Sequence, residues 1–251
     1  MVDFVGAGCG AADLITVRGM RLIQNADVII YAGSLVNPEL TEFAKDSCEI
    51  CNSAHMTLDE VIEVMEKAEA AGKNTVRLHT GDPSLYGAIR EQTDRLDKLG
   101  IEYKICPGVS SFCGAAAALK AEYTLPEISQ SVIITRMAGR TPVPEKESIE
   151  SLAAHGASMV IFLSAGMTSE VSERLQKGGY SAETPAALVY KATWEDEKVC
   201  RCTVGTLAET AEKNGINKTA LIVVGDFLGE NHFLSKLYDP NFETGYRKAK
   251  K

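Results

Sequence analysis

Residues 74–100 read NTVRLHTGDPSLYGAIREQTDRLDKLG, and this stretch decides what kind of fold the chain adopts. It opens with a β-branched, apolar run, passes through Gly81-Asp82-Pro83 and continues as an amphipathic helix. Residues such as Gly and Pro, which interrupt regular structure, often form a plain turn between a strand and a helix. In α/β proteins such a turn also presents side chains to a ligand at the carboxyl edge of a sheet. The stretch predicts a strand-turn-helix unit, with Asp82 either in a turn or in a site.

The same alternation of strand and helix runs through the first half of the chain. Strand-like runs occur at VDFVG, DVIIYA, CEIC, NTVRLH and EYKIC, and helical patterns separate them. The best-marked helix has Thr57 as N-cap, Glu60 completing a capping box and Gly72 at its end. Strands that alternate with helices are typical of a parallel sheet, so we expect a mostly parallel sheet here.

The second half follows a different pattern after the stretch AEYTLPEISQ. Its strand-like runs include SVIITR, SMVIFLS and TALIVVG, and VYKATWEDEKVCRCTV is typical of an antiparallel hairpin with a charged turn. The fold class is therefore α/β, with a domain over 1–120 that holds a mostly parallel sheet and a domain over 121–251 that holds a mixed sheet. Two α/β domains of similar size predict a cleft for a ligand.

Composition excludes several classes of function. The 251 residues carry a net charge of −8, which argues against nucleic acid and membrane surfaces as partners. No apolar run approaches the roughly 18 to 20 residues of a membrane span, and no basic, then apolar, leader opens the chain. Seven cysteines in a long chain with a good core indicate reduced thiols and a cytoplasmic protein.

Two common kinds of site fit the sequence poorly. Gly6, Gly8 and Gly10 give G-x-G-x-G, but Ala11 stands where a dinucleotide fingerprint has its third glycine, and the next strand ends without an acidic residue. A plain tight turn is the alternative. For zinc, the two cysteine pairs lack knuckle turns, so we expect no metal site and interpret them as small core residues. The pairs are Cys48 with Cys51 and Cys200 with Cys202.

No residue pattern indicates a hydrolase or a general base. The histidines are scattered through the chain at positions 55, 79, 155 and 232, and no G-x-S-x-G occurs. A lone histidine is more often structural than catalytic. We therefore expect no essential catalytic side chain.

Four stretches together resemble the tetrapyrrole methyltransferases, in the same order and at similar spacings over nearly the whole chain. They are VGAGCGAADLITVRGMRLIQNADVIIYAGSLV, HTGDPSLYG, CPGVSSFCGAAAAL and TALIVVGDFL. The resemblance implies two α/β domains with S-adenosylmethionine in a trough between them, S-adenosylhomocysteine as product, and a homodimer. Family members commonly have G-x-G-P-G in the first loop, and here Cys9 stands at the proline position.

The resemblance also implies which residues bind the cofactor. In GDPSLYG, Gly81 allows close approach of a ligand, Asp82 accepts hydrogen bonds from ribose hydroxyls or the ammonium group, and Leu85 and Tyr86 pack on it. Ser84 is expected to cap the following helix. The remaining cofactor contacts, matched by position, are Cys9, Ser110, Ser111, Ser164, Ala165, Ala192, Thr219 and Ala220. Each has the alternative of an ordinary small loop residue.

The stretches YAGSLVNPEL, NSAHMTLDE and ITRMAGRTPVPE resemble the members that methylate carbon 11 of precorrin-4 or cobalt-precorrin-4 in cobalamin biosynthesis. The ring carbon of a reduced tetrapyrrole is itself nucleophilic, so positioning suffices for methyl transfer. Substrate carboxylates call for cations, and we expect Arg136, Arg140 and Lys191 to bind them, with solvated surface charge as the alternative. Tyr31 and Ser34 are expected near the macrocycle. Open alternatives are another tetrapyrrole carbon, as in uroporphyrinogen III or precorrin-2/3, or a non-catalytic sensor.

Overall fold

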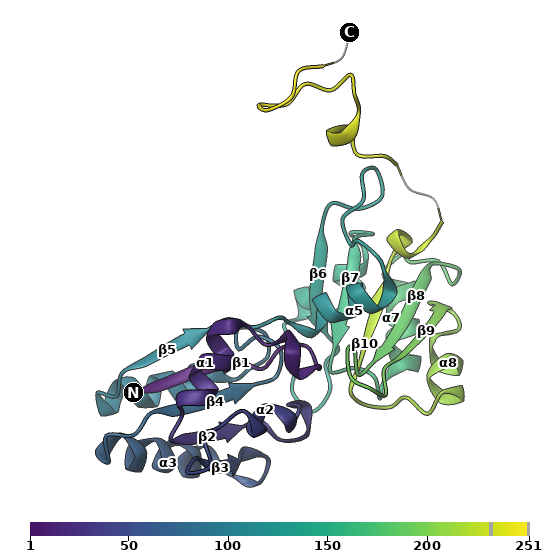
Figure 1. Ribbon diagram of the computed structural model, residues 1–251. Helices are drawn as coiled ribbons and strands as arrows, with labels where there is room; N and C mark the ends of the chain where they lie inside the picture. Colours follow the sequence, from purple (N-terminus) through teal and green to yellow (C-terminus); the bar gives the residue numbers. More distant parts are fainter. Residues whose placement is uncertain (231–232, 250–251) are drawn as a thin grey trace. The chain divides into compact units, whose positions relative to one another are not determined.

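The computed structural model describes residues 1–230 and 233–249, apart from the side chain of Ser34. The chain forms two compact units, one of Met1–Ala115 with Lys191–Glu197 and the other of Ala116–Tyr190 with Lys198–Lys251. Each unit is built on its own five-stranded sheet (Figure 1). Among the described residues, no helix has both the length and the apolar character needed to cross a membrane.

The sheet of the first unit is entirely parallel. Its strand order is β3-β2-β4-β1-β5, so the chain moves one way across the sheet to β3 and the other way to β5. The strands are β1 (Val2–Gly6), β2 (Val28–Tyr31), β3 (Glu49–Asn52), β4 (Thr75–His79) and β5 (Tyr103–Cys106). This confirms the parallel sheet expected from the alternation of strands and helices.

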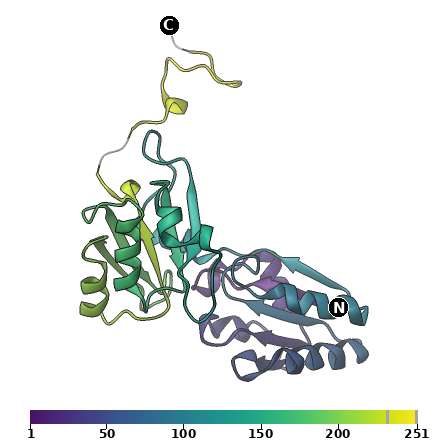
Figure 2. The same ribbon diagram turned by 180° about the vertical axis from the view of Figure 1, so that it is seen from behind.

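Helices cover both faces of this sheet because right-handed crossovers in opposite directions lie on opposite faces. The helices are α1 (Val17–Asn25), α2 (Glu39–Glu42), α3 (Leu58–Ala70), α4 (Ile89–Leu99) and α5 (Ser111–Leu119), the last of which continues into the second unit. Ile23 of α1 packs in one core cluster with Val5, whereas Met65 and Leu96 of α3 and α4 pack in another with Phe4. Figure 2 shows the ribbon of this unit from behind. Neighbouring residues of β1 thus serve opposite faces.

The sheet of the second unit is mixed, as expected. Its order is β6-β7-β10-β8-β9; β6 and β7 are parallel and the other neighbours antiparallel. The strands are β6 (Val132–Arg136), β7 (Ser158–Phe162), β8 (Pro185–Tyr190), β9 (Lys198–Thr203) and β10 (Ala220–Val224). The predicted hairpin is confirmed as β8 and β9, paired from Pro185 with Thr203 to Tyr190 with Lys198.

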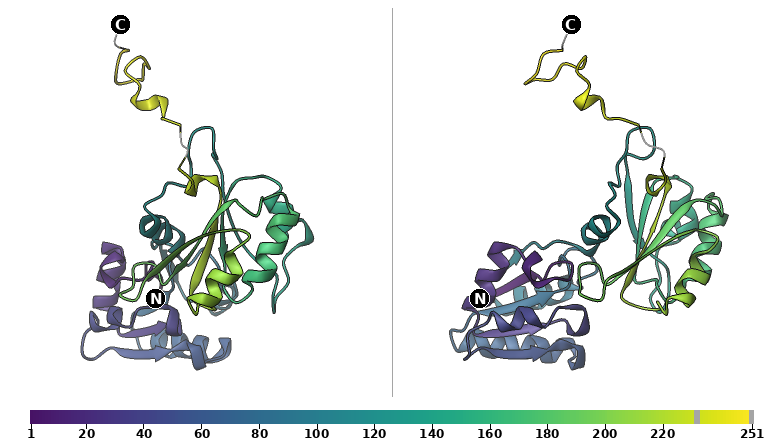
Figure 3. Two further views of the ribbon diagram at one scale, coloured as in Figure 1. Left: turned by 90° about the vertical axis from the view of Figure 1, so that its right-hand side faces the viewer. Right: turned by 45° about the vertical axis from the view of Figure 1, so that its right-hand side comes forward.

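Three helices of the second unit pack on one face of its sheet. They are α6 (Ile149–Ala153), α7 (Thr168–Lys177) and α8 (Leu207–Lys213). Ile149, Val171 and Leu207 bring them into one apolar cluster with Ile161 and Leu188 of the strands. The right-hand view of Figure 3 shows these green helices along the sheet.

The hairpin turn between β8 and β9 belongs to the first unit. Residues 191–197 group with Met1–Ala115. This long-range association brings Ala192 to the glycine-rich loop after β1, although the linear boundary expected near residue 120 would separate them.

Candidate functional site

Three loops meet at the carboxyl ends of adjacent strands in the first unit. Gly6 ends β1, Gly81 follows β4 and Gly108 follows β5. A Cβ on Gly6 would lie 2.5 Å from Gly108 Cα and 2.6 Å from the Gly81 oxygen, and a Cβ on Gly108 would overlap that oxygen. The backbones are therefore in direct contact, which only glycine allows. In α/β proteins, ligands bind at the carboxyl ends of the parallel strands, and here that edge is built from closely packed backbone.

Hydrogen bonds join two of these loops directly. The Gly81 amide donates to the Gly8 oxygen at 3.0 Å, and the Gly8 amide donates to the Gly81 oxygen at 3.3 Å. Both glycines have positive φ, +85° for Gly8 and +63° for Gly81. The G-x-G-x-G motif and the GDPSLYG motif thus form one structure, although 70 residues of chain separate them in order.

Asp82 links the loop after β4 to the loop after β5. Its Oδ2 accepts from the Gly108 amide at 2.8 Å, and its Oδ1 accepts from the Ser84 amide at 2.9 Å and from the Ser84 hydroxyl. Partial burial raises the pKa of Asp82, but these hydrogen bonds outweigh that effect and the pKa lies below its usual value. Asp82 is therefore an ionised loop anchor. Its expected role as a ligand contact stays a prediction.

The expectation that Ser84 caps the next helix is wrong. Helix α4 begins at Ile89, and its N-cap Ala88 makes no side-chain capping bond. Ser84 instead bonds Asp82 within a tight turn, in which a Cβ on Gly87 would overlap the Pro83 oxygen. The carboxylate two residues upstream competes for the hydroxyl, as in a turn closed by an aspartate.

The turn after Asp82 holds its backbone in a costly conformation. Tyr86 and Ala88 have φ of +56° and +49°, in the left-handed region that non-glycine residues rarely adopt. Leu85 is half-buried and Tyr86 is 45 % exposed. Strained backbone of this kind gathers at ligand sites, where the surrounding structure holds it. Leu85 and Tyr86 therefore remain good candidates for ligand contacts.

The loop 191–197 closes over the glycine-rich loop. The Thr193 hydroxyl accepts from the Ala11 amide at 3.0 Å and lies 3.6 Å from Cys9 Sγ. A Cβ on Gly10 would overlap the Ala192 oxygen. Cys9 and Ala192, expected from opposite ends of the sequence to share a site, thus lie together. Thr193 was missed, and its only signal was its place beside Ala192.

Lys191 already has a partner in its own loop. Its Nζ donates to Asp196 Oδ2 at 2.7 Å and lies 5.2 Å from the centre of the Trp194 ring. A substrate carboxylate would have to compete with Asp196 for this ammonium.

Ser110 lies beside Gly81 at the beginning of α5, where a Cβ on Gly81 would be 3.4 Å from Ser110 Cα. Ser110 is buried and Ser111 is half-buried. The Ser110 carbonyl accepts from the amides of Cys113 and Gly114. Tyr31 ends β2 and is half-buried, and Ser34 lies in the short helix Gly33–Leu35. All of the expected residues of the first unit except Ser34, whose side chain is not described, can thus be placed at this edge or beside it.

The expected residues of the second unit lie near the ends of its strands, and two of them, Ser164 and Arg136, make side-chain hydrogen bonds to backbone groups. Ser164 follows β7; its hydroxyl donates to the Phe162 oxygen at 2.7 Å and accepts from the Met137 amide at 2.9 Å. The hydroxyl has thus used its one proton and one of its two lone pairs within the unit. Next to it, Leu163 is 63 % exposed with φ of +53°, a strained apolar residue that the sequence did not single out.

The remaining positions of this unit are less specific. Ala165 and Ala220 are buried, and Thr219 has φ of +54° just before β10. Arg136 uses its guanidinium to bond three carbonyls, of Met137, Thr141 and Pro142, and so braces the loop that presents the exposed Arg140. Whether these residues bind a cofactor or substrate stays a prediction.

His79 is unsuited to act as a base. It is 3 % exposed, its ring stacks on Phe4 at 5.9 Å, and its buried Nε2 has no partner. Burial, aided by the charge of Arg77, lowers its pKa to about 3. The described part of the chain holds no group of three or more metal-ligating side chains. His232 lies outside the described residues.

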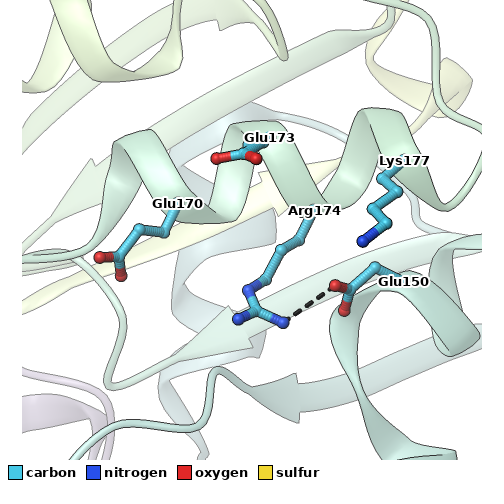
Figure 4. Close-up of a pocket in the computed structure, with 5 residues that line it drawn as sticks. All are labelled: Glu150, Glu170, Glu173, Arg174 and Lys177. Carbon is cyan, nitrogen blue, oxygen red and sulfur yellow. Dashed lines mark hydrogen bonds and ion pairs between the residues drawn. The ribbon is translucent and has the colours of Figure 1, made fainter.

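A separate surface pocket of about 230 Å³ lies on α6 and α7 (Figure 4). It is lined by the charged side chains of Glu150, Glu170, Glu173, Arg174 and Lys177, and Arg174 donates to Glu150 at 2.9 Å. None of the residues expected from the sequence lines it. We therefore place the candidate site at the strand ends and not here.

Comparison with known proteins shows which proteins the chain is similar to. A Methanocaldococcus jannaschii protein named cobalt-precorrin-4 C(11)-methyltransferase is 57 % identical over 251 residues, covering 100 % of this chain and 97 % of that protein. A Sinorhizobium protein named precorrin-4 C(11)-methyltransferase is 44 % identical over 98 % of both chains. The X-ray structure of a cobalt precorrin-4 methyltransferase superposes with a TM-score of 0.89 at 46 % identity, covering 90 % of this chain and 95 % of that one.

The family model described as tetrapyrrole (corrin/porphyrin) methylases matches residues 1–208. This range includes all three glycine loops of the candidate site and the loop 191–197. The chain therefore belongs to the tetrapyrrole methylase family.

Proposed function

We propose that the chain transfers a methyl group from S-adenosylmethionine to carbon 11 of precorrin-4 or cobalt-precorrin-4, in cobalamin biosynthesis. The observation that carries this proposal is the identity of 57 % over all 251 residues to a protein named for that reaction. The geometry supports it because three of the motifs expected to bind the cofactor, the glycine-rich loop, GDPSLYG and PGVSS, are far apart in sequence but share one sheet edge in the first unit.

The residues at this edge fit a ligand with many polar groups and a bulky adenine. Gly8 and Gly81 have no side chain and Ser110 has a small one, so little side-chain bulk separates a ligand from the backbone. The carboxylate of Asp82 is ionised because its pKa is lowered, which suits hydroxyl or ammonium donors. Each carboxylate oxygen has a second lone pair, so the bonds to Ser84 and Gly108 leave room for one more donor.

S-adenosylmethionine, when bound, supplies a methyl group on a positively charged sulfur. The chain's own residues have to hold donor and acceptor in line and exclude water, which is worth up to roughly 7–11 kcal/mol for well-oriented partners. Loops in direct backbone contact are suited to this task because the contact restricts their movement when a ligand binds. The low pKa of His79, about 3, makes that histidine a poor base, which agrees with a mechanism based on positioning.

For the substrate carboxylates we propose Arg140 as the first cation. It is exposed on a loop that Arg136 braces through three carbonyls. Lys191 would join it only if the substrate displaces Asp196.

We further propose a cytoplasmic homodimer. All seven cysteines are free thiols, which fits a reducing compartment. Light scattering on the purified chain tests the dimer, and a mass of about 27.0 kDa, that of one chain, would contradict it.

The decisive experiment offers the purified protein S-adenosylmethionine with metal-free and with cobalt-bound precorrin-4. We expect a product heavier by one methyl group, with the new carbon at position 11 by NMR. The substrate that is methylated faster then shows whether the chain acts on metal-free or on cobalt-bound precorrin-4. Calorimetry provides the control for binding: we expect heat with S-adenosylhomocysteine and none with NAD. Tight binding of NAD with no binding of S-adenosylhomocysteine would contradict the proposed methyltransferase function.

A further inference from the structure

We propose that Arg77 and Gln92 form a buried clamp that positions the loop 82–88 for ligand binding. This inference rests on the proposed function, because the ligand in question is the cofactor assigned above. The hydrogen bonds of the two residues reach the loop only at the backbone oxygen of Ala88, within the described part of the chain. Both therefore act as positioning residues, through the beginning of α4.

Arg77 is a buried cation with no acidic partner. It lies in the middle of β4, the central strand of the parallel sheet, and is 7 % exposed. Burial lowers the pKa of its guanidinium to about 10, so it stays protonated at neutral pH. Within the described part of the chain it forms no ion pair. Burying a charge without a counter-charge is costly, so its hydrogen bonds must hold something in place.

The hydrogen bonds of Arg77 join three elements. Its Nη1 donates to the Ile30 oxygen of β2 at 3.1 Å, and its Nε donates to Gln92 Oε1 of α4 at 3.0 Å. Gln92 is itself buried, at 5 % exposed. Because a guanidinium can only donate, the amide oxygen of Gln92 has to face it and the amide nitrogen has to face away. That nitrogen donates to the Ala88 oxygen at 3.1 Å.

Ala88 is where the clamp meets the site. It is the N-cap of α4 and the last residue of the turn that begins at Asp82. Its φ of +49° and that of Tyr86, +56°, are unfavourable and need support from outside the turn. Asp82 holds the other end of the turn through Gly108. The turn with Leu85 and Tyr86 is thus fixed at one end by a carboxylate and at the other by the Arg77–Gln92 clamp.

The test compares the affinity for S-adenosylhomocysteine with stability in four variants. Gln92→Met keeps the length of the side chain but offers no acceptor, so we expect the dissociation constant to rise at least about tenfold. Gln92→Glu keeps an acceptor for Arg77 but has no amide nitrogen to donate to the Ala88 oxygen. We therefore expect Gln92→Glu to bind S-adenosylhomocysteine about as weakly as Gln92→Met, while its stability stays close to that of wild type because the bond to Arg77 is kept.

The double variant Arg77→Met with Gln92→Met separates positioning from stability. It removes the unpaired buried charge, so its melting temperature should recover above that of Gln92→Met alone. If the clamp positions the loop, affinity stays low despite this recovery. Thr93→Val is the matched control, because Thr93 is equally buried on α4 but its hydroxyl bonds only Arg90 of the same helix. Affinity that returns with stability in the double variant would overturn the proposal.

A ligand-free measurement keeps this test apart from that of the function. Failure of the wild-type chain to bind S-adenosylhomocysteine would remove the proposed function alone. Hydrogen exchange of the amides at 84–89 would then decide on the clamp. We expect exchange about tenfold faster in Gln92→Met than in wild type or Thr93→Val, the effect of about 1.4 kcal/mol of lost local protection. Equal rates in the three proteins would contradict the clamp.

Discussion

The two units secure the loops at the ends of their strands by different means. In the first unit, Gly6, Gly81 and Gly108 bring three backbones into direct contact with no side chain between them. In the second, the hydroxyl of Ser164 and the guanidinium of Arg136 tie the loops through hydrogen bonds to backbone groups. Both arrangements order a strand end, but the first does so at these glycines of the candidate site without any side chain between the backbones.

This difference has a physical consequence for tolerance to substitution. Where backbones are in direct contact, one added methyl group causes a large loss of stability, because no space is available for it. Where a side chain holds a loop by hydrogen bonds, its removal causes a smaller loss of stability, because water or a neighbouring group can replace part of the lost bonding. The first unit should therefore be far more sensitive to small changes than the second.

The largest effect is expected for Gly108→Ala in the first unit. Its Cβ would overlap the Gly81 oxygen, and the backbones on both sides are fixed by their sheet. We expect a loss of about 3 kcal/mol or more in the free energy of unfolding, together with loss of cofactor binding. Urea denaturation and calorimetry measure the two effects.

Gly139→Ala is the matched control in the second unit. A Cβ there would meet only Met167, at an ordinary 3.5 Å, so we expect a change within about 0.5 kcal/mol. Equal losses of unfolding free energy in Gly108→Ala and Gly139→Ala would contradict the proposed difference between the two units.

A moderate effect is expected for Ser164→Ala in the second unit. The substitution leaves the amide of Met137 buried without an acceptor, which costs about 1–3 kcal/mol. Because the hydroxyl is engaged within the unit, the affinity of the folded protein for S-adenosylhomocysteine should change little. The exposed Ser131→Ala serves as the control for urea denaturation. A large loss of affinity at full stability would show instead that the Ser164 hydroxyl reaches the ligand.

The smallest effect on stability, and the most informative, is expected for Asp82→Asn. The three hydrogen bonds from Ser84 and Gly108 favour the charged carboxylate, so we expect a loss of about 0.5–1.5 kcal/mol at pH 7. The folded pKa of Asp82 is lowered, so its contribution is fully present above the unfolded pKa of about 4 and disappears as pH falls through the folded pKa. The gap in stability between wild type and variant should therefore narrow below about pH 4.

Affinity measured on a second variant, Asp82→Ala, distinguishes an anchor from a ligand contact. If the carboxylate also binds ribose or ammonium, Asp82→Ala should raise the dissociation constant by roughly tenfold to a hundredfold. Reduced stability with unchanged affinity would leave Asp82 as an anchor only. A gap in stability that does not change with pH would contradict the anchor role.

Local patterns were sufficient for most of the elements. The capping box of Thr57 and Glu60, the parallel first sheet and the hairpin of β8 and β9 were predicted and are present. The capping box and the hairpin depend on residues close together in the chain, and the parallel sheet follows from the local alternation of strands and helices. The expected cap at Ser84 failed because Asp82, two residues away, is a stronger partner for its hydroxyl than the distant helix end.

The sequence by itself thus determined the class of fold and, through its motifs, which residues belong together. The order of the parallel strands was decided only in the tertiary structure, because long crossovers allow several orders. That order places β1 between β4 and β5 and so brings Gly6, Gly81 and Gly108 into contact. It also places Arg77 in the central strand, where α4 covers it. The clamp with Gln92 exists because burial leaves a guanidinium only the acceptors that the fold supplies.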